Sequence, residues 1–149
     1  MATQSINEYL TEDHDYLDDL LEGFQEWKPK ELAKARVFLS QFVSALHRHL
    51  AWEERILFPL FEQKTDQTGL TSTLLAEHQQ IREWLGTLNT KIEQNDIDSE
   101  HEEKMLVEEL GGHNAREEYA LYPELDKLLT AEEKTRVFEA IAMVQDATP

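Results

Sequence analysis

The sequence contains no cysteine, no long apolar run and few basic residues. Without cysteine there can be no disulfide, thiolate metal site or thiol catalysis. No apolar run approaches the roughly 20 residues that cross a bilayer. The amino terminus has neither the basic start nor the apolar stretch of a signal peptide. We therefore expect a cytoplasmic protein with no membrane contact.

The shortage of basic residues also bears on possible partners. Asp and Glu number 31 against 14 Lys and Arg, which gives a net charge of −17. Binding of nucleic acid needs basic patches that neutralise phosphates, so nucleic acid and anionic lipid are both disfavoured as partners. Solubility alone is the favoured interpretation of this charge, and attraction of cations towards a metal site is the alternative.

Strand patterns are missing as well, because strict apolar–polar alternation is absent and the breaks fall between long helical runs. Apolar residues recur at spacings of three and four in four segments, and each of these stripes includes one histidine. The 149 residues suit a single all-α domain over 1–149. We expect an antiparallel up-down four-helix bundle made of two helical hairpins, at about 5–63 and 68–127, and a short fifth helix at about 130–145.

The two hairpins repeat a motif in the same register. The segment His49-Leu-Ala-Trp-Glu-Glu-Arg-Ile-Leu-Phe-Pro59 recurs as His113-Asn-Ala-Arg-Glu-Glu-Tyr-Ala-Leu-Tyr-Pro123. The interval along the chain from His14 to His78 equals that from His49 to His113. A histidine and a glutamate four residues apart project from one face of a helix. Each hairpin therefore supplies one histidine and then a His-x-x-x-Glu pair.

The stripes direct six groups into the bundle core, and these are the candidate metal ligands: His14, His49, Glu53, His78, His113 and Glu117. Ionised carboxylates in a dry core are costly unless they are paired or bound to metal, and no Lys or Arg lies on the stripes. Four imidazoles and two carboxylates suit iron or manganese, with zinc possible. Any one of these residues alone is more often a hydrogen-bonded core residue or a surface pair. Their joint, repeated arrangement favours two metal ions.

On these residues and motifs the chain resembles the hemerythrin-like (HHE cation-binding) domain family, in a four-His, two-Glu variant. The motifs are His14, His49-x-x-x-Glu53 before Pro59, His78, and His113-x-x-x-Glu117 before Pro123. The resemblance implies two non-haem irons joined by the carboxylates and an oxo or hydroxo bridge. Iron is preferred to manganese or zinc on this basis.

Two departures from the family pattern matter. Oxygen-carrying members have a fifth histidine four residues before or after the one at His78, and this sequence has Leu74 and Arg82 there. Each iron would then have about five donors, which leaves an open position on both. The last bridging carboxylate of those members would fall on Glu118, whereas the internal repeat favours Glu117.

The favoured function is a di-iron protein that binds, senses or reacts with O₂, NO or peroxide; whether it turns over as an enzyme stays open. One alternative is an iron donor or repair protein for iron–sulfur centres, and another is a simple oxygen or iron store. A ferritin-like oxidase would need Glu-x-x-His pairs, which the sequence lacks. A metal-free helical interaction module is the remaining alternative.

Two further features give local expectations. Pro59 should kink or end its helix near Arg55 to Phe58. Gly111 and Gly112 are unfavourable within a helix by roughly 1 kcal/mol each, and either close approach of a neighbouring helix or ligand or simple tolerance could account for them. Trp52, Tyr119 and Tyr122 flank the motifs, and packing around the bundle is the favoured interpretation of all three.

Overall fold

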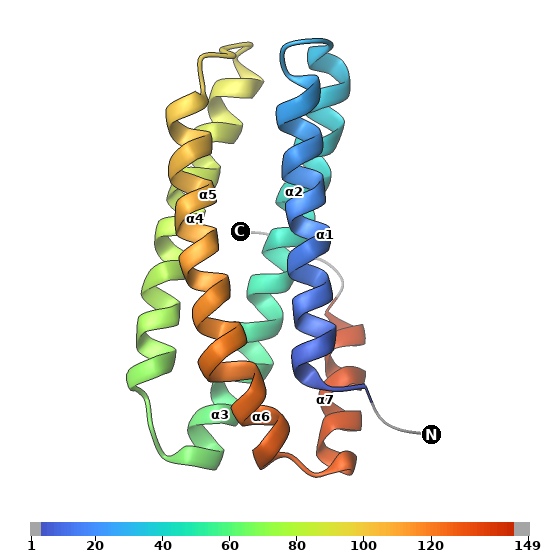
Figure 1. Ribbon diagram of the computed structural model, residues 1–149, viewed down its shortest axis with the longest axis vertical. Coiled ribbons are helices and arrows are strands. Elements are labelled where there is room, and N and C mark those ends of the chain that lie inside the picture. The colour runs from blue at the N-terminus through green and yellow to red at the C-terminus, as the bar shows by residue number, and fades with distance from the viewer. Residues whose placement is uncertain (1–3, 145–149) are drawn as a thin grey trace.

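The computed structural model describes residues 4–144, which form an antiparallel bundle of four helical rods with a short helix against one end (Figure 1). One hairpin contains α1 (Ile6–Trp27) and α2 (Leu32–Trp52), and the other contains α4 (Gly69–Glu93) and α5 (Glu100–Arg116). The all-α four-helix prediction is confirmed. Within the described residues, no helix is both long enough and apolar enough to span a bilayer.

The second and fourth rods do not end at their prolines. α2 continues through a π-helical turn, η1 (Glu53–Leu57), into α3 (Phe58–Thr65). α5 continues in the same way through η2 (Glu117–Leu121) into α6 (Tyr122–Leu128). The disturbance expected near Arg55 to Phe58 therefore takes the form of one wide turn before each proline.

Polar side chains fix the ends of several helices. The Ser5 hydroxyl accepts the backbone N–H of Glu8 at the start of α1. The Asp126 carboxylate of α6 accepts the backbone N–H groups of Ile6 and Asn7 at 2.7 and 3.0 Å, which fastens α6 to the start of α1. Unsatisfied N–H groups at a helix start need such acceptors.

The fifth helix, α7, spans Ala131–Met143 and packs beside α1 at the lower end of the bundle (Figure 1). It begins with the expected capping box, in which Thr130 and Glu133 exchange hydrogen bonds between side chain and backbone. It ends slightly before the predicted boundary, and residue 145 lies outside the described residues.

A buried polar layer divides the apolar core into two clusters. On α1, Leu10 belongs to one cluster, Leu17 belongs to the other, and His14 lies between them. The other three rods cross the layer in the same way. One cluster contains Leu21, Phe24, Leu39, Phe42, Leu46, Ile81, Leu85 and Leu106; the other contains Ile6, Trp52, Leu57, Phe58, Leu74, Leu121, Tyr122 and Leu125. One apolar cluster thus lies on each side of the predicted site along the length of the bundle.

The close approach of a neighbouring helix considered for Gly111 and Gly112 is wrong. A Cβ atom built at either residue would meet nothing within 4 Å, and both residues are exposed. Neither glycine is therefore required by packing within the chain.

Candidate metal centre

The structure brings all six predicted residues together in the polar layer. None of these residues is more than 2% exposed. Their potential ligand atoms form two groups, each within 4.8 Å of one another. We call His14, His49, Glu53 and Glu117 the first half-site, and Glu53, His78, His113 and Glu117 the second half-site. The two glutamates belong to both, as carboxylates shared between two ions would.

The two His-x-x-x-Glu pairs have matching geometry. Nε2 of His49 lies 3.3 Å from Oε2 of Glu53, and Nε2 of His113 lies 3.1 Å from Oε2 of Glu117. Each glutamate is the first residue of a π-helical turn. In each turn the hydrogen bond spans five residues, from Phe58 N–H to the Glu53 carbonyl and from Tyr122 N–H to the Glu117 carbonyl. Residues five apart are thereby brought onto the same face, and turns of this kind occur frequently at functional sites.

The four histidines are held from outside by four acidic side chains, here called the outer carboxylates. Nδ1 of His14 lies 2.6 Å from Glu118, and Nδ1 of His49 lies 2.7 Å from Asp13. In the second half-site, Nδ1 of His78 lies 2.6 Å from Glu54 and Nδ1 of His113 lies 2.9 Å from Glu77. A carboxylate that accepts Nδ1–H leaves the Nε2 lone pair free, and this arrangement orients metal-binding histidines.

The outer carboxylates bear on the choice between Glu117 and Glu118. Glu117 is fully buried and points into the layer, whereas the Glu118 side chain is 37% exposed and contacts His14 at Nδ1. Of the two, Glu117 is therefore the better placed to bridge two ions.

Arginine supports the outer carboxylates on one side of the centre. Arg82 lies 2.7 Å from Glu54, and Arg116 donates to Glu77 at 2.8 and 3.0 Å. When the two halves of the chain are aligned on the repeat, the first half-site has Asp18 in place of Arg82 and Trp52 in place of Arg116. The same outer shell of carboxylates thus has different surroundings in the two half-sites.

Tyr122 is a member of the polar layer that the sequence patterns missed. It is fully buried, and its hydroxyl oxygen lies 2.5 Å from Oε2 of Glu53 and 3.0 Å from Oε1 of Glu117. The expected helix would turn Tyr122 about 140° away from Glu117, because each residue adds about 100°. The π-helical turn removes that rotation.

The repeat could have revealed the outer carboxylates, because Asp13 aligns with Glu77 and Glu54 aligns with Glu118, so both pairs are acidic. No α-helical stripe contains them, since each lies one residue from an inner donor. Tyr122 had a weaker signal, because its partner in the repeat is Phe58.

The ionisation of the side chains in the polar layer follows from their close pairing with one another. Burial disfavours a charged His49, yet the charge of Glu53 and hydrogen bonds to Asp13 and Glu53 raise its pKa to about 10. Burial likewise opposes charge on His113, while hydrogen bonds and charges from Glu117 and Glu53 raise its pKa to about 11. For Glu53, burial opposes ionisation, but the charge of His49 and several hydrogen bonds hold the pKa well below its ordinary value. A cation that binds here displaces protons from imidazoles.

The donor atoms of these residues are better suited to binding a pair of cations than to hydrogen bonding with one another. Nε2 atoms of His14 and His49 are 3.1 Å apart, as are those of His78 and His113. Oε2 of Glu117 is buried and has no hydrogen bond of acceptable geometry. Cations would accept lone pairs from all of these atoms, and the donor set of imidazole nitrogen and carboxylate oxygen suits transition metals.

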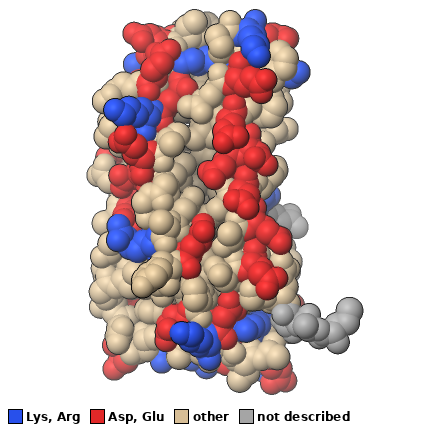
Figure 2. All heavy atoms as spheres, viewed as in Figure 1, with Lys and Arg blue, Asp and Glu red and all other residues tan. Residues whose placement is uncertain are grey.

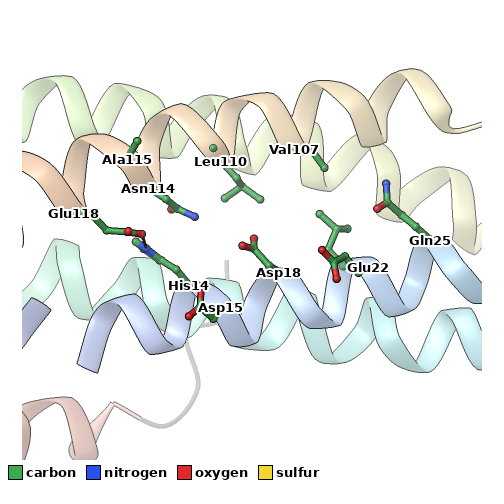
Figure 3. Close-up of a pocket in the computed structure, with 12 residues that line it drawn as sticks. His14, Asp15, Asp18, Glu22, Gln25, Val107, Leu110, Asn114, Ala115 and Glu118 are labelled. Atoms are coloured by element: carbon green, nitrogen blue, oxygen red, sulfur yellow. Dashed lines mark hydrogen bonds and ion pairs between the residues drawn. The ribbon is translucent and has the colours of Figure 1, made fainter. Parts of the chain in front are cut away.

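A groove of about 480 Å³ leads from the surface to the first half-site. It runs between α1 and α5, and His14 and Glu118 lie at one end of it (Figure 3). Asp15, Asp18 and Glu22 line the α1 side. Figure 2 shows further acidic side chains along the face that carries α1 and α5. The negative charge of this groove favours the approach of cations.

A family model described as the hemerythrin HHE cation binding domain matches residues 5–125. The matched range includes the six inner donors, the four outer carboxylates and Tyr122. No curated protein and no solved structure matches the chain.

Proposed function

Because the chain belongs to the hemerythrin HHE cation-binding domain family, we propose that it binds two iron ions in the polar layer and that this centre binds, senses or reacts with O₂, NO or peroxide. His14 and His49 would hold one ion and His78 and His113 the other, with Glu53 and Glu117 shared between them. The irons would supply redox chemistry and coordination positions for a small ligand.

One observation carries the proposal. All four buried imidazoles have Nδ1 occupied by a carboxylate, so all four Nε2 atoms are available towards two shared glutamates. A core that needed only internal hydrogen bonds would not require four acidic partners outside and two inside. The outer carboxylates increase the basicity of the imidazoles and fix their orientation, which is their usual effect at metal sites.

Iron is preferred to zinc because Glu53 and Glu117 belong to both half-sites, so neither half-site is a separate closed set of four ligands. Structural zinc sites are almost always tetrahedral and closed by four ligands to a single ion. Manganese would accept the same donors, so metal analysis has to accompany any spectrum.

The test is anaerobic reconstitution of the full chain with ferrous iron, followed by metal analysis and optical spectra before and after addition of O₂, NO and peroxide. We expect about two irons per chain and a spectrum that responds to at least one of these ligands. His49→Ala should lower the iron content, whereas His101→Ala should not, because His101 is exposed and packs against Trp84. Far fewer than two irons per chain would rule out the proposal.

A second candidate is an iron donor for iron–sulfur centres, and the acidic groove favours it because it brings negative charge to His14, at the edge of the centre nearest to the surface groove. The chain has no cysteine with which to hold a cluster of its own. Reconstituted protein should then transfer iron to an apo iron–sulfur protein faster than free chelated iron does. Iron that stays bound during such an assay excludes this candidate and leaves the first.

A further inference from the structure

Tyr122 gives the two half-sites different sets of donors. Its hydroxyl oxygen contacts four atoms that all belong to the first half-site: Nε2 of His14 at 3.2 Å, Nε2 of His49 at 3.4 Å, Oε2 of Glu53 at 2.5 Å and Oε1 of Glu117 at 3.0 Å. The hydroxyl can donate one hydrogen bond and accept two, so hydrogen bonding can satisfy at most three of these four contacts.

The equivalent position in the second half-site has no oxygen. Phe58 stands there, aligned with Tyr122 by the repeat. The rings are placed alike: the Tyr122 ring centroid is 5.6 Å from that of His14, and the Phe58 centroid is 5.3 Å from that of His78. The hydroxyl is therefore an addition to a matched pair of rings.

The distances among the donors of the first half-site are those of neighbouring ligands on one ion. Nε2 of His14 is 3.1 Å from Nε2 of His49 and 3.3 Å from Oε1 of Glu117, and Nε2 of His49 is 3.3 Å from Oε2 of Glu53. Adjacent ligands of an octahedral ion with bonds of about 2.1 Å are about 3.0 Å apart.

The Tyr122 oxygen completes that arrangement. Four donors separated by such distances form a square, and a point at its centre lies about 2.3 Å from each donor. The Tyr122 oxygen is farther than this from all four donors. The oxygen therefore lies beside the square of donors, at the place of a fifth ligand, and it leaves the centre of the square for an ion.

We propose that Tyr122 is a fifth protein ligand of the ion in the first half-site, bound through its phenolate oxygen, and that the ion in the second half-site has no such ligand. Coordination replaces the phenolic O–H bond with a metal–oxygen bond and releases the proton to solvent, with no change in oxidation state. This inference rests on the proposed function, because it requires both ions to be bound.

The proposal changes where a small ligand can bind. The first ion would have five protein donors and the second only four. The open position expected on both irons would then remain mainly on the ion beside Phe58 and Leu74, which belong to the same buried apolar cluster.

The test uses the full chain reconstituted with iron and oxidised to the ferric state. Phenolate bound to ferric iron gives a charge-transfer band in the visible region, and excitation in that band enhances tyrosine ring vibrations in the resonance Raman spectrum. We expect both signals in the unaltered protein and their loss in Tyr122→Phe, with about two irons per chain retained in each. Tyr119→Phe is the matched control, because Tyr119 is 89% exposed, and it should keep both signals.

Phe58→Tyr is the complementary variant, since it places a hydroxyl at the equivalent position of the second half-site. We expect its visible band to be about twice as intense as that of the unaltered protein. This gain does not depend on whether Tyr122→Phe folds. Unaltered protein with two irons and no phenolate signal overturns the proposal, as does a signal that persists in Tyr122→Phe. Iron content far below two contradicts the di-iron function instead, so the two failures can be told apart.

Discussion

The two half-sites agree in the atoms that face a metal and differ in what surrounds those atoms. Both have two imidazoles, two outer carboxylates and the shared glutamates, with matching distances. The first half-site adds the Tyr122 hydroxyl and opens towards an acidic groove. The second has Phe58 in place of that tyrosine and arginines on both outer carboxylates. Under the proposed function, the shared features would hold the two cations, and the differing features would control access to each cation and the ligands it can take.

The groove beside the first half-site is open because two residues that line it differ from their counterparts in the other half of the repeat. Gly111 lines it, and the residue that the repeat aligns with Gly111 is His47, a half-buried side chain. Asp18 lines it as well, where the other half of the chain has Arg82. Gly111 and Asp18 thus stand where the other half of the repeat has an imidazole ring and a guanidinium group. The first half-site therefore has more space and more negative charge beside it.

The largest expected effect comes from removing a donor that both half-sites share. Glu53→Ala should reduce the iron content from about two per chain towards zero, because both ions lose a carboxylate. His49→Ala and His113→Ala each remove a donor from one half-site and should leave about one iron per chain. Metal analysis after reconstitution measures this. Equal iron contents in the three variants would contradict the sharing of Glu53.

A smaller effect should appear in the binding of an external anion to the ferric centre. Azide, followed by optical titration, should bind at one position per chain in the unaltered protein, on the ion beside Phe58. Phe58→Tyr should weaken this binding about tenfold or more, since a phenolate would compete for that position. Tyr122→Phe should add a second binding step. Azide affinity that is unchanged in both variants would mean that neither ring position faces an open site.

The outer carboxylates should affect one ion at a time. Glu118→Gln should weaken binding of the ion held by His14, and Glu54→Gln that of the ion held by His78, each by about 10–100-fold. Titration against a chelator of known affinity separates the two binding steps. If one substitution weakened both steps equally, the half-sites would not behave as separate binding positions.

The arginines should have the smallest effect. Arg82 and Arg116 are 28% and 45% exposed, and ion pairs at such positions contribute about 0–1 kcal/mol. Replacing either one with alanine should therefore lower the affinity of the second half-site by no more than about fivefold. Lys104→Ala is a suitable control, because Lys104 pairs only weakly with Glu108 on the surface. A loss as large as that of Glu54→Gln would mean that the arginine, and not the carboxylate, positions His78.

The sequence predicted the bundle and all six inner residues because α-helical periodicity holds along most of each rod. His14, His49, His78 and His113 continue apolar stripes, and a stripe directed to the core remains visible when its residue is polar. Tyr122 was assigned to packing because the same periodicity fails in the π-helical turn. The outer carboxylates lie off the stripes, and which imidazole each one contacts depends on the pairing of different rods. Glu118 of η2 reaching His14 of α1 is an example.

Each π-helical turn is followed two residues later by a proline, Pro59 or Pro123. Deleting one residue from a turn would restore an ordinary helix without rotating the segment beyond it. The proline ring would then clash with the carbonyl four residues earlier, at a cost of about 3 kcal/mol. Replacing the proline alone would remove this penalty against the ordinary helix. The proline and the extra residue of each turn are therefore matched, since the proline is accommodated without the clash only while the turn stays wide.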